Sequence, residues 1–314
     1  MPEDRETIAD DTLRLIFTCC HPALPGDAQV AMTLREVCGL TTEEIATAFL
    51  AKPATIAQRI VRAKTRIRDA NLPYQVPEPA EWAERLDAVL HTIYLIFNEG
   101  YEASHGEALL RRELSQEAIR LARLLVTLHP DAEAEGLLAL LLLHEARAAA
   151  RTDAAGDLVL LPDQDRTLWN TDLIAEGIAH ARAALARPPV GVYTLQALIA
   201  SEHMRAATAA ATDWNAISDL YDLLATADRS PVVALNRAVA IAMRDGPEAG
   251  LDLIAPLIAS PLATYRFAHA AKADLLRRAG RWSEARDAYQ AALALTEQTA
   301  ERRYLEKRLR EMAD

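Results

Sequence analysis

The polar and apolar positions of this chain follow the spacing of α-helices from Trp82 onward. Apolar residues recur there three and four positions apart, so each segment presents one apolar face to a neighbour. The predicted helices include Trp82–Asn98, Arg112–Leu128, Ala132–Ala150, Thr171–Ala186 and Val192–Thr208. One exception is Gly156–Asp165, where a short strand-like run between turn residues predicts a small hairpin. We therefore expect an all-α protein.

Two short helices are predicted early in the chain, each with a start signal. Asp27 is a candidate N-cap for a helix that runs to about Val37 and is closed by Gly39. Thr41 and Glu44 have the three-residue spacing of a capping box and open the next helix. These signals predict compact helical hairpins in this part of the chain.

A third helix follows and is amphipathic. Pro53 begins it, because proline is tolerated in the first turn of a helix. Its predicted buried stripe consists of Ile56 and three residues within roughly 40° of it on a helical wheel, namely Ile60, Ala63 and Ile67. Ile45 and Phe49 lie four positions apart on the preceding helix and can cover this stripe. Since the connection Leu50–Lys52 is short, the pair of helices predicts a helix-turn-helix.

The opposite face of the third helix is cationic and polar. Six basic residues and no acidic one lie between Lys52 and Arg68, although the whole chain has a net charge of −11. An α-helix fits the major groove of DNA, and Arg and Gln can make paired contacts to base edges. We predict that bases are read by Thr55, Gln58, Arg59 and Arg62. We predict phosphate contacts for Lys52, Lys64, Arg66 and Arg68. The alternative is a solvated basic face on a surface helix.

The stretch LTTEEIATAFLAKPATIAQRIVRAKTRIRDA, residues 40–70, resembles region four of extracytoplasmic-function (ECF) sigma factors. Three further strings resemble the group of these factors that carries a C-terminal TPR-like extension, namely Leu13–Leu24, Tyr94–Tyr101 and Leu160–Trp169. The resemblance implies promoter recognition as a dissociable subunit that binds the RNA polymerase core. It also implies that the −35 element is faced by Thr55, Gln58, Arg59, Arg62 and Arg66.

ECF sigma factors carry a region two ahead of region four. Region two binds core polymerase and melts the −10 element. Few residues precede the region-four-like segment in this sequence. The resemblance therefore implies a chain that corresponds to the C-terminal part of such a factor, without region two.

The best linker in the chain is Leu72–Glu81, which contains Pro73, Pro77 and Pro79. We therefore predict a helix-turn-helix domain at residues 1–75 and a helical domain at residues 76–314. An acidic surface of the second domain could dock on Arg59, Arg62 and Arg66 and compete with DNA.

The last third of the chain shows an internal repeat, clearest at about residues 200–300. Trp214 and Trp282 lie 68 positions apart, and so do Tyr221 and Tyr289. This spacing is twice the 34-residue period of tetratricopeptide (TPR) repeats. Small residues fall at the close-packing positions of the last unit, and Gly280 allows its turn. We predict TPR-like hairpins that offer a surface for an intramolecular or protein partner; the alternative is an ordinary stack of helical hairpins with coincidental spacing.

Cysteine and histidine residues near the N-terminus raise the question of a metal site. Cys19, Cys20, His21 and Cys38 lack the spacing of a structural zinc site, so we interpret the cysteines as packing residues.

Four acidic residues in one loop raise the question of calcium. They are Asp153, Asp157, Asp163 and Asp165, and they lack the EF-hand spacing. We expect salt bridges to Arg151 or Arg166 within a polar hairpin.

Other motifs have structural interpretations. His144-Glu145 and Glu202-His203 do not form an HExxH pattern, so we expect polar contacts in the core or a groove. Asn98–Tyr101 predicts a helix end with Gly100 just beyond it.

The sequence gives no pattern for catalysis or membrane insertion. A P-loop, a dinucleotide-binding fingerprint and a nucleophile elbow are absent from it, so we predict neither an enzyme nor a cofactor or metal. No apolar run approaches a membrane span, the start of the chain is polar and acidic, and three cysteines suit a reducing cytosol. The hypothesis is sequence-specific DNA binding in transcription initiation by a cytoplasmic protein. The alternative is a helical scaffold or small-ligand-binding module without DNA binding.

Overall fold

The computed structural model describes residues 11, 12, 14–49, 51–75, 77, 81–102 and 110–312. No strand occurs in these residues, which confirms the all-α prediction. The N-terminal part contains α2 (Gly26–Met32), the π-helical turn η1 (Thr33–Val37), α3 (Thr42–Ala48) and α4 (Pro53–Asp69). The middle contains α5 (Trp82–Tyr101), α6 (Arg112–Leu128), α7 (Ala132–Glu145), α8 (Thr171–Leu185) and α9 (Val192–Arg205). The last part contains α10 (Trp214–Ala227), α11 (Pro231–Asp245), α12 (Pro247–Ala259), α13 (Arg266–Arg278), α14 (Trp282–Ala294) and α15 (Thr299–Glu311).

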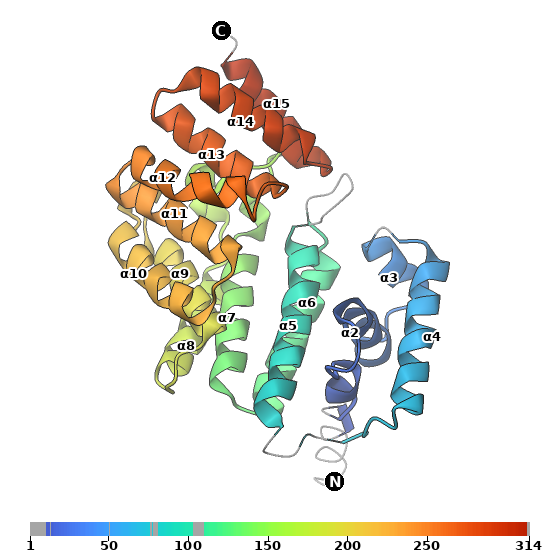
Figure 1. Cartoon of the computed structure of the whole chain (residues 1–314). Coiled ribbons are helices and arrows are strands. Elements are labelled where there is room, and N and C mark those ends of the chain that lie inside the picture. Colours follow the sequence, from blue (N-terminus) through green and yellow to red (C-terminus); the bar gives the residue numbers. More distant parts are fainter. Residues whose placement is uncertain are drawn as a thin grey trace.

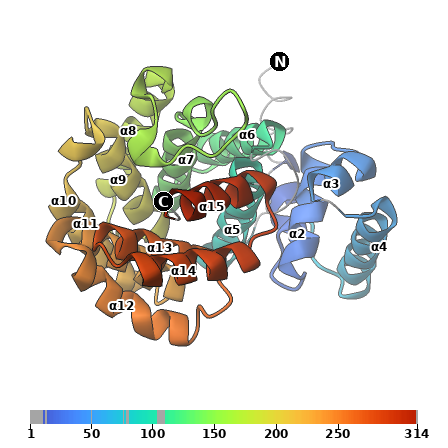
Figure 2. The same ribbon diagram turned by 90° about the horizontal axis from the view of Figure 1, so that it is seen from above.

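From α5 onward each helix packs against the next one in the chain, and the helices form a curved stack (Figure 1). The view from above shows α2–α4 beside α5, at the edge of this stack (Figure 2). Arg303 of α15 pairs with Asp157 and donates to the Gly156 carbonyl, so the last helix contacts the segment that follows α7. None of the helices in the described ranges is long and apolar enough to cross a membrane.

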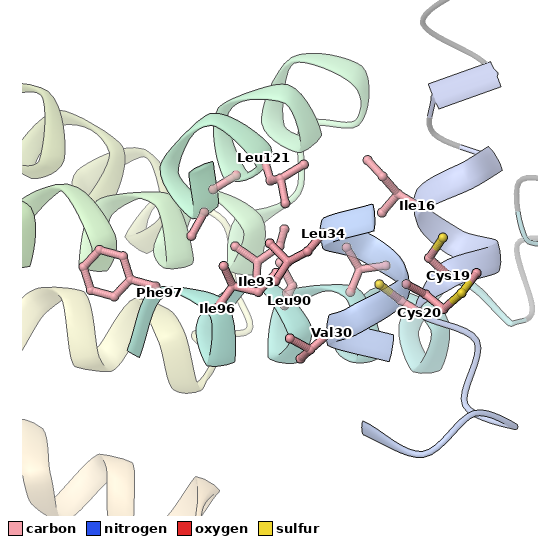
Figure 3. Close-up of a cluster of buried hydrophobic side chains, with 14 of the residues drawn as sticks. Ile16, Cys19, Cys20, Val30, Leu34, Leu90, Ile93, Ile96, Phe97 and Leu121 are labelled. Atoms are coloured by element: carbon pink, nitrogen blue, oxygen red, sulfur yellow. The ribbon is translucent and has the colours of Figure 1, made fainter. Parts of the chain in front are cut away.

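One hydrophobic core joins the N-terminal helices to the middle of the chain. It includes fully buried residues from the segment before α2, from η1 and from α5–α7, among them Phe17, Leu34, Ile93 and Leu121. Figure 3 shows Leu34 of η1 beside Leu90 and Ile93 of α5. This core therefore crosses the predicted linker, of which residues 76 and 78–80, including Pro79, lie outside the described residues. The division at residues 75 and 76 remains a prediction.

A second core lies in α11–α15. Tyr289 is 1% exposed and packs with Ala273, Ala285 and Ala292, which are fully buried. Small residues let α13 and α14 approach closely, and Gly280 makes the turn between them with a φ of 74°. Trp282 begins α14 but is 55% exposed. The hairpin geometry expected for the last unit is present, while the assignment to TPR repeats stays a prediction.

The hairpin predicted at Gly156–Asp165 is not contained in that range, because the run pairs only at its start, with the residues before Gly156. The structure has one isolated antiparallel bridge between Thr152 and Leu158, followed by 3-10 turns at Leu161–Asp163 and Arg166–Leu168. Pro162 has no N–H to extend a ladder, and the Asp153 side chain accepts from the N–H groups of its own turn.

The salt bridges expected in this segment are also wrong. Arg151 pairs with Glu102 at 3.0 Å, and Arg166 donates to the carbonyls of His203 and Ala206. Both arginines therefore connect the segment to other elements and do not neutralise its aspartates.

Gly100 does not lie beyond a helix end. It lies inside α5, which continues to Tyr101. A Cβ on Gly100 would lie 2.3 Å from the backbone nitrogen of Ser115 in α6. The glycine is therefore required for close packing of two helices, which the local sequence does not reveal.

Candidate nucleic-acid interface

The start of α3 is fixed by a capping box. The Thr41 hydroxyl accepts from the Glu44 N–H at 3.1 Å, and the Glu44 carboxylate accepts from the Thr41 N–H at 2.6 Å. The N–H and the hydroxyl of Thr41 both donate to the Glu44 carboxylate and hold the pKa of Glu44 below its usual value, because they favour its charged form. The capping box is thus confirmed, and it fixes the start of α3.

The apolar stripe of α4 is buried as predicted. Ile56, Ile60 and Ala63 are at most 6% exposed, and Ile67 packs against the same core from its edge. Ile45 of α3 is fully buried, and Phe49 is half-buried beside it. Leu50, in the predicted connection, lies outside the described residues. Because one face of α4 is held in the core, its opposite face has a fixed orientation toward solvent.

The candidate DNA-binding residues lie on this outer face. Six of them are exposed, namely Lys52, Thr55, Gln58, Arg62, Lys64 and Arg66. Arg59 is half-buried. A groove of about 890 Å³ runs along α4 and is bounded by Pro25 and Ala28 at the start of α2. Val61 lines this groove and is 61% exposed. Its exposure was not predicted from the sequence, although its position outside the isoleucine stripe indicated it.

Two of the candidate cations have acidic partners. Arg59 Nε lies 3.0 Å from Asp27 Oδ2, and Lys64 Nζ lies 2.9 Å from Glu36 Oε1. Within the described ranges, Arg62 and Arg66 form no ion pair. The most freely available charges on α4 are therefore those of Arg62 and Arg66.

The partner of Arg59 corrects one prediction. Asp27 does not cap a helix, because α2 begins at Gly26 after Pro25 and the cap makes no side-chain hydrogen bond. Asp27 lies in the first turn, where the helix dipole favours a carboxylate, and it faces α4. Sequence reasoning missed Asp27 and Glu36 as partners of α4, because no local spacing relates them to that helix.

One acidic residue of α5 and one just beyond its end line a cavity with Arg59. Glu99 and Glu102 line a cavity of about 350 Å³ together with Arg59 and Phe49. Their carboxylates are paired within the helical part, Glu99 with Arg111 at 4.0 Å and Glu102 with Arg151 at 3.0 Å. The carboxylates that pair with Arg59 and Lys64 thus come from Asp27 of α2 and Glu36 of η1.

The thiols near the N-terminus are packing groups in this structure. Cys19 and Cys20 are buried, and Cys20 Sγ lies 3.3 Å from the Thr33 hydroxyl. Burial raises the pKa of both thiols, so they are protonated at neutral pH. In the described ranges, no group of His, Cys, Asp and Glu has the arrangement of a metal site.

The geometry agrees with comparisons to known proteins. Residues 14–67 match the family described as Sigma-70, region 4, which covers α2, η1, α3 and nearly all of α4. Residues 85–185 match a family of unknown function, DUF6596. An uncharacterized protein of Rhizobium meliloti (strain 1021) is 46% identical over 305 residues, which are 97% of this chain and 72% of that protein. The chain belongs to the family of that protein.

The region 4 match places the candidate interface in a functional class. It shows a sigma-70 region 4 domain at residues 14–67, which suggests a sigma-factor-like protein and supports a DNA-binding role in transcription initiation. It indicates a transcription factor rather than an enzyme. The family of unknown function begins within α5 and ends at the last residue of α8, so it covers the helices that share the first core with α2 and η1.

Proposed function

We propose that this chain reads the −35 promoter element as an ECF-type sigma factor, with α4 in the major groove. The observation that carries the proposal is the outer face of α4. It combines Gln58, Arg62 and Arg66 on a helix whose other face is held in the core. A helix with a fixed orientation can present the same side chains to successive base pairs.

The side chains of α4 have different roles in this proposal. Thr55, Gln58, Arg59 and Arg62 contact base edges, because the first three lie in the first half of the helix and Arg62 lies next to its middle. Lys52, Lys64 and Arg66 contact phosphates and contribute affinity without sequence preference. Arg59 leaves Asp27 when it reaches DNA, since one guanidinium cannot serve both partners fully.

The proposed partners are promoter DNA and the RNA polymerase core. The TPR-like hairpins of α10–α15 form an interaction domain, because their consecutive packing leaves an extended surface, as repeat proteins use. A rival function, a helical module without DNA binding, predicts that α4 has no affinity for duplexes.

A salt titration of the full chain on labelled promoter duplexes tests the proposal, with and without bacterial core RNA polymerase. We expect affinity to fall steeply with salt, because phosphate contacts release counterions. Arg62→Ala should weaken binding by about 1–3 kcal/mol and reduce the discrimination between promoter and scrambled duplexes. Arg187→Ala is the matched control, because Arg187 is exposed just after α8 and outside α2–α4.

Two results would contradict the proposal. One is the absence of salt-dependent binding in both arms, which favours the rival function. The other is an equal loss in Arg62→Ala and Arg187→Ala, which would indicate general attraction to a polyanion.

A further inference from the structure

A second concave site lies in the helical part, away from α4. Helices α7, α9, α10 and α11 line a cavity of about 510 Å³, and they are neighbours in Figure 1. Leu140, Ile199 and Val233 form part of an apolar wall. Cavities of this size and composition hold small molecules in other proteins. The DNA-binding proposal does not use this site.

One wall of the cavity carries a cation without an acidic partner. Arg147, just beyond α7, is half-buried, and in the described part of the chain no carboxylate pairs with it. Its guanidinium lies 3.5 Å from His144 Nδ1 and 5.3 Å from the centre of the Tyr101 ring. The neighbouring Arg151, by contrast, pairs with Glu102. Burial lowers the pKa of Arg147, but an arginine stays charged at neutral pH.

The carboxylates near the cavity make no ion pair with Arg147 in the described ranges. The negative charge of Glu102 partly offsets the effect of burial on the pKa of Arg147 without forming an ion pair with it. The Glu102 carboxylate pairs instead with Arg151 at 3.0 Å and Arg266 at 4.0 Å. Asp228 lines the cavity, and its carboxylate accepts from the Ser230 N–H at 2.8 Å. A shielded cation without a counterion is unfavourable, and a bound anion would relieve this cost.

Two histidines in the same wall are neutral. Burial and then Arg147 lower the pKa of His144 well below its usual value. The same two causes, together with Arg166, lower the pKa of His203 to about 4. Each imidazole therefore offers one N–H donor at neutral pH. The side-chain amides of Gln196 and Asn236 add further donors on α9 and α11.

We propose that this cavity binds a small organic anion. Its carboxylate or phosphate pairs with Arg147 and accepts hydrogen bonds from His144, His203 and Asn236. Its apolar part packs on Leu140 and Ile199. The guanidinium fork suits both kinds of acid, since each presents two oxygens in one plane.

Titration calorimetry on the full chain with benzoate, phenyl phosphate and benzamide tests this site. We expect saturable binding of at least one anion at up to about 10 mM, and at least tenfold weaker binding of the uncharged benzamide. The stronger of the two anions distinguishes a carboxylate from a phosphate ligand. Arg147→Met should weaken anion binding at least tenfold, and Arg187→Met should not change it.

A second readout does not depend on the variant. Histidine proton resonances should show the pKa of His203 rising when the anion binds, because a nearby negative charge favours imidazolium. Asn236→Leu, a near-isosteric change on α11, should also weaken binding if Arg147→Met fails to fold. The proposal would be overturned if neither anion binds, if benzamide binds as tightly as the anions, or if the pKa of His203 does not change.

Discussion

Gly100 shows how one residue sets the distance between two helices. It lies inside α5, and the backbone of α6 passes so close that a Cβ would meet Ser115 N at 2.3 Å and Leu114 Cβ at 2.9 Å. Backbone atoms cannot move aside as the end of a flexible side chain can. The glycine is therefore a packing requirement of the first core.

We predict that Gly100→Ala destabilises the protein by about 1–3 kcal/mol, because α5 and α6 must separate or bend. Gly26→Ala is the matched control, since nothing lies within 4 Å of a Cβ there. It should be neutral or stabilise by about 0.4–1 kcal/mol, because alanine reduces the entropy of the unfolded chain. Urea unfolding monitored by circular dichroism measures both changes. Equal effects of the two substitutions would contradict the close approach of α5 and α6.

At the residue scale, the sequence predicts what depends on neighbours along the chain. The spacing of Ile56 and Ile60 is a local property of one helix, so their burial could be predicted. The role of Gly100 depends on Ser115, which belongs to the next helix, and a glycine near a helix end has the same local pattern as a cap. Arg147 and His203 likewise meet only because α7 and α9 pack together.

At the scale of elements, α4 combines a predictable shape with unpredicted partners. Its start was evident from Pro53, and its buried stripe and exposed polar face were evident from periodicity. The carboxylates of Asp27 and Glu36 reach it from α2 and η1. Residue spacing along the chain does not predict these contacts, because they join separate elements. These two ion pairs place negative charge beside the proposed DNA-reading face.

We predict that Asp27→Asn combined with Glu36→Gln strengthens duplex binding severalfold at low salt, since both carboxylates repel phosphate. Stability should change by less than about 1 kcal/mol, because all four side chains are partly exposed. The control is Asp172→Asn with Glu113→Gln, which removes the same charge from exposed positions on α8 and α6. Anisotropy titrations compare the two variants. An equal gain in both would mean that net charge, and not these ion pairs, controls the affinity.

At the scale of the whole molecule, the first core groups helices that the prolines at Leu72–Glu81 separate in sequence. The proline-rich segment at Leu72–Glu81 indicated a boundary, because prolines interrupt helices. The first core nevertheless contains Phe17 and Leu34 together with Leu90 and Leu121. Sequence patterns identify breaks in secondary structure, but they do not show whether apolar faces on both sides of a break pack together. The second core lies in α11–α15 and includes Leu275.

Two matched core substitutions test whether the first core unfolds as one unit. Leu34→Ala and Leu275→Ala each remove a side chain that is at most 2% exposed, and each should cost about 2–5 kcal/mol. If the N-terminal helices and α5–α7 form one cooperative unit, Leu34→Ala accelerates amide hydrogen exchange in α5–α7 and leaves α13 and α14 protected. Leu275→Ala should give the reverse pattern. Leu34 projects from η1 toward α5 (Figure 3), so a cavity there weakens the contact between the two parts directly. If exchange in α5–α7 is unchanged by Leu34→Ala, the N-terminal helices unfold separately and the boundary at residues 75 and 76 is the correct division.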